Sequence, residues 1–364
     1  MNLLKLLSEA VEKDASDIHL KFGKRPVLRV KQEIIELKDE EILDDNILEE
    51  FISQIMSPVQ KTKFLSQMDM DLAYELENIS RFRVNIFRQR GHIGIVMRRI
   101  KSYIPSFEEL SLPPVLKKIS GFHDGFILVT GPTGCGKSTT LASIIDYIDI
   151  NQSKHIVTIE DPIEYIYKDK NSIIDQREVG LDTLSFNAAL KHVLREDPDI
   201  ILIGELRDVE TFESAVRSSE TGHLVFGTLH TTDTLTTITR ILDFFPQSQH
   251  DQVRKVIAYN LKSTVCQRLV PRKDGNGVVP VCEIMVVTPI ISRLIVENKI
   301  NKIYGAIVGG KEEGMQSFNQ HLVQLIQADT ITKETGFTVS PAPDALEMNL
   351  RGIYLDEETR IIGE

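Results

Sequence analysis

A nine-residue stretch at residues 131–139, Gly-Pro-Thr-Gly-Cys-Gly-Lys-Ser-Thr, has the residue types and the spacing that bind a polyphosphate. The apolar residues 126–130 precede it as a buried strand, and residues 141–145 continue it as a helix. Strand, G-x-x-x-x-G-K-[ST] and helix is the order of a P-loop, whose backbone N–H groups surround the phosphates at the positive end of the helix. Lys137 would reach the outer phosphates and the Ser138 hydroxyl would ligate Mg²⁺. The sequence therefore predicts a nucleoside triphosphate site formed by Gly131, Pro132, Thr133, Gly134, Cys135, Gly136, Lys137, Ser138 and Thr139.

A second acidic position follows the apolar residues 200–203, where Gly204 and Glu205 end a predicted strand. A carboxylate at the end of such a strand completes an ATP site by helping to hold Mg²⁺. The commoner form has an aspartate where this chain has Gly204, so Mg²⁺ ordering would depend on Glu205 or on the next motif. The alternative is a core strand whose terminal Glu205 is only solvated.

Three carboxylates lie just beyond another predicted strand, at residues 155–159: Glu160, Asp161 and Glu164. Ligands bind at the carboxyl ends of the strands of an α/β sheet. A carboxylate placed there could polarise an attacking water or hold Mg²⁺ through a water. Taken alone, the segment is better explained as an acidic loop that caps a helix.

Two histidines, His223 and His230, bracket the predicted strand at residues 224–228. Residues seven apart on a strand point to opposite faces, so the pair cannot share a metal ion. We expect one of them to sense the γ-phosphate at the strand end and the other to be structural.

Residues 81–101 contain seven basic residues and no acid. In a strand, Arg81 and Arg83 project from one face while Phe82 and Val84 are buried on the other. Two other interpretations of these basic residues are a face that is simply solvated and a face that binds nucleic acid. In a chain with a net charge of −11, arginine fingers that reach a triphosphate on a neighbouring domain or subunit fit better. The seven are Arg81, Arg83, Arg88, Arg90, Arg98, Arg99 and Lys101.

The elements that position these residues divide the chain into a small α/β module at residues 1–103, a proline-bearing linker at 104–114, and a larger α/β domain at 115–364. Predicted strands alternate with helices from residue 125 onward, which implies a largely parallel sheet covered on both faces. Beyond about residue 289 the pattern becomes helical. The module at 1–103 carries short strand patterns at 18–22 and 27–30, a helix at 43–56, and a strand pair at 71–76 and 81–87.

Composition narrows the class of protein further. The three cysteines form no C-x-x-C pair, so no zinc site or disulfide framework is indicated, and a reduced, cytoplasmic compartment fits. Residues 1–11 have the spacing of an amphipathic domain helix rather than of a signal peptide. No stretch approaches the ~20 apolar residues that span a bilayer, so we expect membrane association only through a partner.

Together these segments resemble the secretion-ATPase superfamily, and specifically the type IV pilus retraction ATPases of the PilT and PilU type. Residues 15–20, Ala-Ser-Asp-Ile-His-Leu, resemble the family's N-terminal motif, and residues 81–85 its arginine strand. Residues 158–164 resemble the Asp box, 204–208 the atypical Walker B motif, and 222–231 the His box. These motifs occur in the family's order and cover nearly the whole chain.

The resemblance implies a PAS-like N-terminal domain, a RecA-like P-loop ATPase core with C-terminal helices, and assembly into a homo-hexamer. It implies that Glu164 is the general base, that Glu205 helps to position Mg²⁺ or water, and that Arg81, Arg83 and Arg98 approach the phosphates. His223 and His230 carry over as His-box residues, with His230 the better γ-phosphate sensor, and Glu160 belongs to the nucleotide-binding set. Cys135 stands where the family usually has serine, and its backbone N–H can still serve the loop.

The resemblance leads to one main hypothesis: a cytoplasmic ATPase, peripheral at the inner membrane, that uses ATP and Mg²⁺ to act on a pilus platform protein and retract the pilus. Its rivals are an accessory retraction paralogue that binds a partner ATPase, and an ATPase of type II secretion or pilus extension. The absence of the extension type's four zinc-site cysteines favours retraction, whereas residues 291–297 match the retraction type's C-terminal motif only in part. A nucleic-acid translocase is disfavoured by the acidic balance and by the absence of stacking aromatics beside the basic strand.

Overall fold

The structure, a computed structural model, describes residues 1–31, 33–76, 79–100 and 102–353. They form two compact units: the described residues up to 103 with 164–166, and residues 104–163 with the described residues from 167 onward. Residues 164–166 group with the first unit, and the sequence-based division into domains at 1–103 and 115–364 stays a prediction. Lys101, the polar turn at 77–78 and the chain from residue 354 lie outside the described residues.

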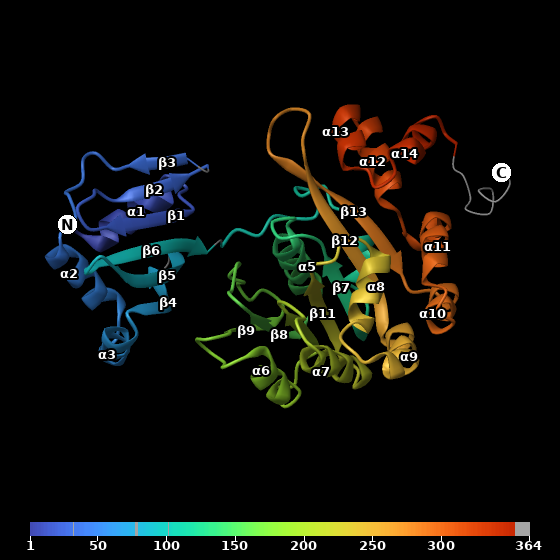
Figure 1. Cartoon of the computed structure of the whole chain (residues 1–364), viewed down its shortest axis with the longest axis horizontal. Helices are drawn as coiled ribbons and strands as arrows, with labels where there is room; N and C mark the ends of the chain where they lie inside the picture. Colours follow the sequence, from blue (N-terminus) through green and yellow to red (C-terminus); the bar gives the residue numbers. More distant parts are fainter. Residues whose placement is uncertain (32, 77–78, 101, 354–364) are drawn as a thin grey trace. The chain divides into compact units, whose positions relative to one another are not determined.

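The first unit is built on an antiparallel sheet of six strands in the order β3-β2-β1-β6-β5-β4. Its strands are β1 (Asp17–Lys21), β2 (Val27–Val30), β3 (Glu33–Glu36), β4 (Asp69–Leu76), β5 (Ser80–Gln89) and β6 (His92–Ile100). Its helices are α1 (Leu3–Glu12), α2 (Asp45–Ile55) and α3 (Pro58–Gln67). Figure 1 shows these elements in blue to teal.

The core of the first unit lies on one face of this sheet. Phe82, Val84 and Ile86 of β5 are buried and pack with Leu3, Leu7 and Phe51 of the helices. The intervening residues of β5, among them Arg81 and Arg83, are only half-buried, which is the period-two alternation expected of a half-buried strand. The predicted strands and the predicted helix at 43–56 are therefore present, whereas β3 and β6 were not predicted.

The second unit contains a seven-stranded sheet in the order β13-β12-β7-β11-β10-β8-β9. All neighbouring strands are parallel except the antiparallel pair β12–β13, so the predicted largely parallel sheet is confirmed. The strands are β7 (Gly125–Thr130), β8 (His155–Glu160), β9 (Ile173–Glu178), β10 (Ile200–Ile203), β11 (Leu224–Leu229), β12 (Leu261–Pro271) and β13 (Val278–Val286).

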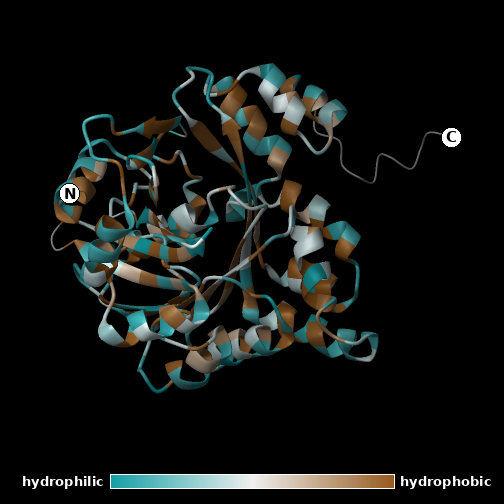
Figure 2. Ribbon diagram, turned by 60° about the vertical axis from the view of Figure 1, so that its left-hand side comes forward, coloured by the Kyte–Doolittle hydropathy of each residue, from teal (hydrophilic) through white to brown (hydrophobic). Residues whose placement is uncertain are grey.

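Helices cover both faces of this sheet, and the alternating strand residues divide between two cores. Ile127 and Val129 of β7 pack with Leu141 and Ile144 of α5 on one face. On the other, Phe126 and Leu128 belong to a core shared with α6 to α11. The helices are α4 (Val115–Ile119), α5 (Lys137–Asn151), α6 (Phe186–Val193), α7 (Val209–Glu220), α8 (Thr234–Leu242), α9 (His250–Asn260), α10 (Pro289–Val296) and α11 (Ile303–Gly309). In Figure 2 these helices show brown and teal stretches side by side, as amphipathic helices do.

After α11, the described part of the chain adds a small helical layer against the β12–β13 hairpin (Figure 1). It consists of α12 (Phe318–Gln327), α13 (Lys333–Val339) and α14 (Pro343–Leu350). Phe318 and Leu322 of α12 pack there on Cys266 and Val281 of the hairpin. The helical C-terminal region predicted from about residue 289 is therefore present.

The segment at 104–114, expected to be a linker, is part of the second unit. Phe107 and Leu112 are buried in the core that α5 shares, and the Ser143 hydroxyl donates a hydrogen bond to the Pro105 carbonyl at 2.6 Å. The prolines prevent regular strand pairing but not packing, and burial of two large apolar side chains holds the segment against the sheet.

Within the described part of the chain, no helix combines the length and the apolar character that crossing a membrane requires.

Candidate active site at the carboxyl edge of the second sheet

The parallel strands of the second sheet end level with one another, which brings the predicted motifs to one edge. Thr130 of β7 pairs with Leu229 of β11, and Ile203 of β10 pairs with Ile159 of β8. The residues that follow these four positions are the P-loop, the His230 loop, the Gly204–Glu205 motif and Glu160. The sheet register alone therefore assembles four of the sequence motifs at its carboxyl edge.

The P-loop adopts backbone conformations that only glycine tolerates well. Gly131, Gly134 and Gly136 have φ values of +146°, +80° and +88°. A Cβ atom on Gly131 would lie 2.4 Å from the Gln267 carbonyl oxygen, so a side chain cannot fit at this position. Nothing lies within 4 Å of a Cβ built on Gly134, so this glycine is required by its backbone angle rather than by crowding.

The loop forms the cradle that a triphosphate needs. The Lys137 ammonium donates hydrogen bonds to the carbonyl oxygens of Gly131 and Pro132, at 2.7 and 3.2 Å, so its charge lies inside the turn. Gly136 caps α5 without a side-chain acceptor. A helix that begins in this way turns its first N–H groups and its positive end toward a bound phosphate.

A buried glutamine fixes the loop from the neighbouring strand. Gln267 of β12, only 2% exposed, donates from Nε2 to the Cys135 carbonyl at 2.6 Å and accepts from the Thr140 hydroxyl at 2.8 Å. Cys135 itself is buried, and that burial raises the pKa of its thiol. The Cys135 carbonyl thus anchors the loop to β12, whereas the predicted role of its backbone N–H at the phosphates stays a prediction.

Glu205 lies at the centre of a chain of charged side chains on this edge. Its Oε1 is 3.3 Å from Nε2 of His230, and its Oε2 is 2.8 Å from the Arg207 guanidinium. Arg207 also lies 3.6 Å from Asp161, and its hydrogen bond to Glu205 raises its pKa. The Walker B and His-box motifs therefore meet through direct contacts, and Glu205 is oriented from both sides.

Gly204, which stands where the commoner form has an aspartate, lies at a crowded position. A Cβ atom at this position would lie 3.2 Å from the Ile159 carbonyl oxygen and 3.3 Å from the Glu160 Cα. The Gly204 N–H donates to the same Ile159 carbonyl at 2.8 Å, so the ends of β8 and β10 are drawn close together. This close approach also positions Glu160, which accepts hydrogen bonds from the Thr158 hydroxyl at 2.7 Å and from Gln176 at 3.3 Å.

The two histidines of the His box lie at opposite ends of β11 rather than on it. His230 follows Leu229 at the carboxyl edge, whereas His223 precedes Leu224, which pairs with Gly125 at the amino edge. Seven strand residues span about 23 Å. His223 Nδ1 is bonded at 3.0 Å to the Ser218 carbonyl and the Thr221 hydroxyl. His223 therefore lies at the other end of β11 from this chain's P-loop, with the local contacts of a structural residue, and its place in the nucleotide-binding set stays a prediction.

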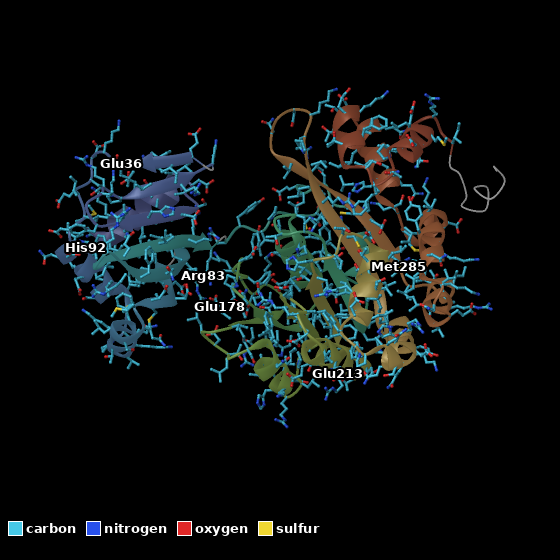
Figure 3. The ribbon with its side chains drawn as sticks, in the orientation of Figure 1. Glu36, Arg83, His92, Glu178, Glu213 and Met285 are labelled. Carbon is cyan, nitrogen blue, oxygen red and sulfur yellow. The ribbon has the colours of Figure 1, made fainter. Side chains whose placement is uncertain are left out.

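The predicted arginines lie on the half-buried face of the first unit's sheet. Arg83 of β5 and Arg98 of β6 are direct cross-strand neighbours, and Arg83, labelled in Figure 3, lies 3.9 Å from Asp71. Arg98 forms a 2.8 Å ion pair with the buried Asp17 of β1. Burial raises the pKa of Asp17, but hydrogen bonds from Arg98 and Ser16 outweigh it, so the pKa lies below its ordinary value.

Arg81 and Glu164 also belong to the first unit. Arg81 faces Glu75 across the β4–β5 pair, and Glu164 is exposed. Their roles at the phosphates, and those of Arg83 and Arg98, stay predictions.

Sequence reasoning missed Gln267 and gave no role to Arg207 or Asp17. Gln267 lies on a strand that was not predicted, far from the P-loop in sequence, so a single chain carries no signal that joins them. Arg207 could have been found, since it stands two residues after Glu205 in the same motif.

Comparison with known proteins gives concordant matches. A family model described as type II/IV secretion system protein matches residues 2–335. The type IV pilus retraction ATPase PilT of Pseudomonas aeruginosa is 41% identical over 344 residues, which are 94% of this chain and 99% of PilT. The type IV pilus ATPase PilU of the same organism is 39% identical over 351 residues, 96% of this chain and 92% of PilU. A crystal structure of the pilus retraction motor PilT with bound ADP has a TM-score of 0.88 and 43% identity, and the match covers 95% of this chain and 99% of that one.

Proposed function

The chain belongs to the type II/IV secretion system protein family of ATPases, and on that premise we propose that it is a hexameric motor that hydrolyses ATP to power retraction of a type IV pilus. The observation that carries the proposal is the meeting of the P-loop, Glu205 and His230 at one sheet edge. These are the parts that phosphoryl transfer to water needs: a phosphate cradle, a carboxylate and a polar group at the γ-phosphate.

The P-loop supplies the binding step. The backbone of residues 131–136 and the positive end of α5 would hold the phosphates of ATP, and the Lys137 ammonium would turn from the Gly131 and Pro132 carbonyls to the outer phosphates. Mg²⁺ would neutralise the phosphate charge, and the residues present fit it: Ser138, in the first turn of α5, carries a hydroxyl, and Glu205 lies at the same edge of the sheet.

The residues around the γ-phosphate would carry the hydrolytic step. His230 and Arg207 contact the two oxygens of Glu205, and these contacts would orient the carboxylate when water attacks. Glu164 is proposed as the general base. Arg81, Arg83 and Arg98 are proposed to neutralise the charge that develops in the transition state, in the manner of arginine fingers from a neighbouring subunit.

Coupling to work requires partners. We propose a homo-hexamer at the cytoplasmic face of the inner membrane, where changes between nucleotide states turn a platform protein of the pilus machine. No nucleic acid takes part in this scheme.

An accessory role is the second candidate, because the chain is almost equally identical to PilT and PilU. In that role the protein would hold ATP and a paralogous retraction ATPase while contributing little hydrolysis itself. The cluster at Glu205 supports the autonomous motor, since the P-loop, Glu205 and His230, which are proposed to carry hydrolysis, lie at one edge of the sheet.

Steady-state Mg²⁺-ATP hydrolysis by the purified protein, run beside Glu205→Gln and Lys137→Ala, tests the proposal. We expect turnover by the wild type and its loss in both variants. A folded hexamer that binds ATP and does not turn it over would support the accessory role. Wild-type turnover by Lys137→Ala would refute the site.

A further inference from the structure

A buried carboxylate that no predicted motif contains lies beside the active-site edge. Glu283 of β13 is 3% exposed. It pairs with Cys266 of β12, Cys266 pairs with Thr130 of β7, and Thr130 pairs with Leu229 of β11. Glu283 is therefore in the same cross-strand row as the last residue before the P-loop and the last residue before His230.

Glu283 points to the face of the sheet that α8 covers. Met285, two residues along β13 and labelled in Figure 3, belongs to the core that contains Ile238 and Ile241 of α8. Residues two apart on a strand share a face. Cys282 and Ile284, which alternate with them, belong to the opposite core.

The Glu283 carboxylate makes a direct contact with the start of α8. Its Oε1 accepts a hydrogen bond from the backbone N–H of Thr234 at 2.9 Å. Thr234 is the first residue of α8, and Asp233, the residue before it, accepts from the Thr236 N–H instead. Glu283 thus satisfies a first-turn donor that the capping side chain does not reach.

Further buried contacts link the same turn to the end of β7. The Thr234 hydroxyl lies 2.9 Å from that of Thr264, and the Thr231 and Thr237 hydroxyls lie 2.6 Å apart. Thr237 also lies 3.5 Å from the Thr130 hydroxyl, directly before the P-loop.

The loop that carries His230 is only residues 230–233, between Leu229 of β11 and Thr234 of α8. Strand pairing fixes its first end, and Glu283 holds its second. We propose that Glu283 is a positioning residue for ATP hydrolysis, which holds the first turn of α8 so that His230 stays in contact with Glu205. This inference rests on the proposed role of His230 in the hydrolytic site.

The chemistry of Glu283 suits a positioning role. Burial raises its pKa, and hydrogen bonds from Thr234 oppose that shift. Either protonation state keeps an oxygen that accepts the Thr234 N–H. The oxygen rather than the charge is therefore what the contact needs.

Two substitutions of Glu283 test whether the contact with Thr234 depends on the acceptor oxygen or on the negative charge. Glu283→Gln keeps an acceptor of the same length, and we expect kcat and KM within about two-fold of the wild type. Glu283→Met keeps the shape without an acceptor, and we expect kcat to fall about ten-fold with little change in KM, because a small displacement of a catalytic group lowers the rate without weakening binding. Hydrogen–deuterium exchange of the peptide over residues 230–237 should rise in Glu283→Met and not in Glu283→Gln.

A matched control removes a different buried acceptor that contacts the same strand. His321 of α12 accepts the Cys282 N–H through Nδ1 at 2.9 Å and is likewise buried. We expect His321→Leu to lower thermal stability as much as Glu283→Met does, with wild-type kcat.

A second variant keeps the proposal testable where Glu283→Met does not fold. Thr234→Pro removes the backbone N–H that donates to Glu283 and leaves the Glu283 carboxylate in place. Proline is tolerated here because Thr234 is the first residue of α8 and the preceding Asp233 is extended. Thr234→Pro should reproduce the low kcat, whereas Thr234→Val, which keeps the N–H, should not.

A double-mutant cycle with His230→Ala decides whether Glu283 acts through His230. We expect Glu283→Met to lower kcat in the wild-type background and to have no further effect beside His230→Ala. Additive losses, wild-type kcat in Glu283→Met, or an equal loss in Glu283→Gln would each overturn the proposal. Absence of hydrolysis by the wild type would instead refute the proposed function, and the exchange measurement would still test the contact.

Discussion

The Nε2 atom of His230 lies 3.3 Å from Oε1 of Glu205, although the two residues follow different strands and stand in different motifs. The contact exists because β10 and β11 are parallel neighbours in register, with Ile203 beside Gly227. The other Glu205 oxygen accepts from Arg207, so the carboxylate is held between two cationic or polar groups. Each group should matter more for the rate than for stability.

Arg207→Ala should reveal this difference. Arg207 is half-exposed, and exposed ion pairs contribute only ~0–1 kcal/mol, so the unfolding temperature should barely change. Turnover should fall about ten-fold, because Glu205 loses one of the two groups that orient it. Steady-state hydrolysis and thermal unfolding of the same preparation measure both effects. Arg217→Ala, at the exposed end of α7, is the control and should leave both unchanged.

Arg83→Ala tests the arginine-finger hypothesis. Arg83 lies 3.9 Å from Asp71, a loose pair that leaves its guanidinium available for another anion. ATP binding should persist while kcat falls by about 10³, the typical effect of losing an arginine finger. Fluorescent nucleotide titration and single-turnover hydrolysis separate the two steps.

The control for this prediction lies on the other face of the same sheet. Arg99 pairs in register with the buried Phe82 and lies 3.0 Å from Asp14. Arg99→Ala should keep normal turnover. Equal losses in both variants would indicate damage to the first unit rather than removal of a finger.

The active-site edge could be predicted from sequence because its motifs are local. The P-loop, Glu205 and His230 each follow a short apolar strand, and the parallel arrangement implied by alternating strands and helices places all strand ends together. The same local pattern places His223 and His230 at the two ends of one strand, β11, but it does not show which of them contacts a nucleotide.

The parts that sequence reasoning missed are non-local. β12 is buried along most of its length, without the alternation that marks a half-buried strand, and its partner β13 follows a turn with Gly275 and Gly277. Gln267 and Glu283 lie on these strands. Gln267 is 132 residues from Cys135 of the P-loop in the sequence. Only strand pairing, which one sequence does not display, brings them to the site.

Gln267→Leu should remove the hydrogen bonds that hold the P-loop against β12. The Cys135 carbonyl and the Thr140 hydroxyl would lose their buried partner, at a cost of about 1–3 kcal/mol in the free energy of unfolding. Affinity for ADP should fall about ten-fold, because the loop must be ordered again on binding. Calorimetric titration with ADP and thermal unfolding measure these two effects.

Gln316→Leu is the matched control for the loop. Gln316 is also buried and donates to the Cys282 carbonyl at 3.0 Å, away from the P-loop. It should lose stability without losing ADP affinity. An unchanged ADP affinity in Gln267→Leu would contradict the role assigned to Gln267.

His321 predicts a pH dependence of the second unit's stability. Burial lowers the pKa of His321 from 6.5 to about 4, since its ring is enclosed between α12 and β13. The unfolded chain therefore binds a proton between pH 6.5 and about pH 4 that the folded chain does not. Stability from this residue is fully present above pH 6.5, decreases as the pH falls, and levels off below about pH 4.

The total loss over that interval should be about 3 kcal/mol, at 1.36 kcal/mol per pKa unit. Scanning calorimetry of the wild type and of His321→Gln between pH 4 and pH 7 measures it. The glutamine can still accept the Cys282 N–H but does not titrate, so its unfolding temperature should fall less steeply with pH. Parallel curves for the two proteins would mean that the folded His321 binds a proton as readily as the unfolded one, and that other groups cause the acid instability.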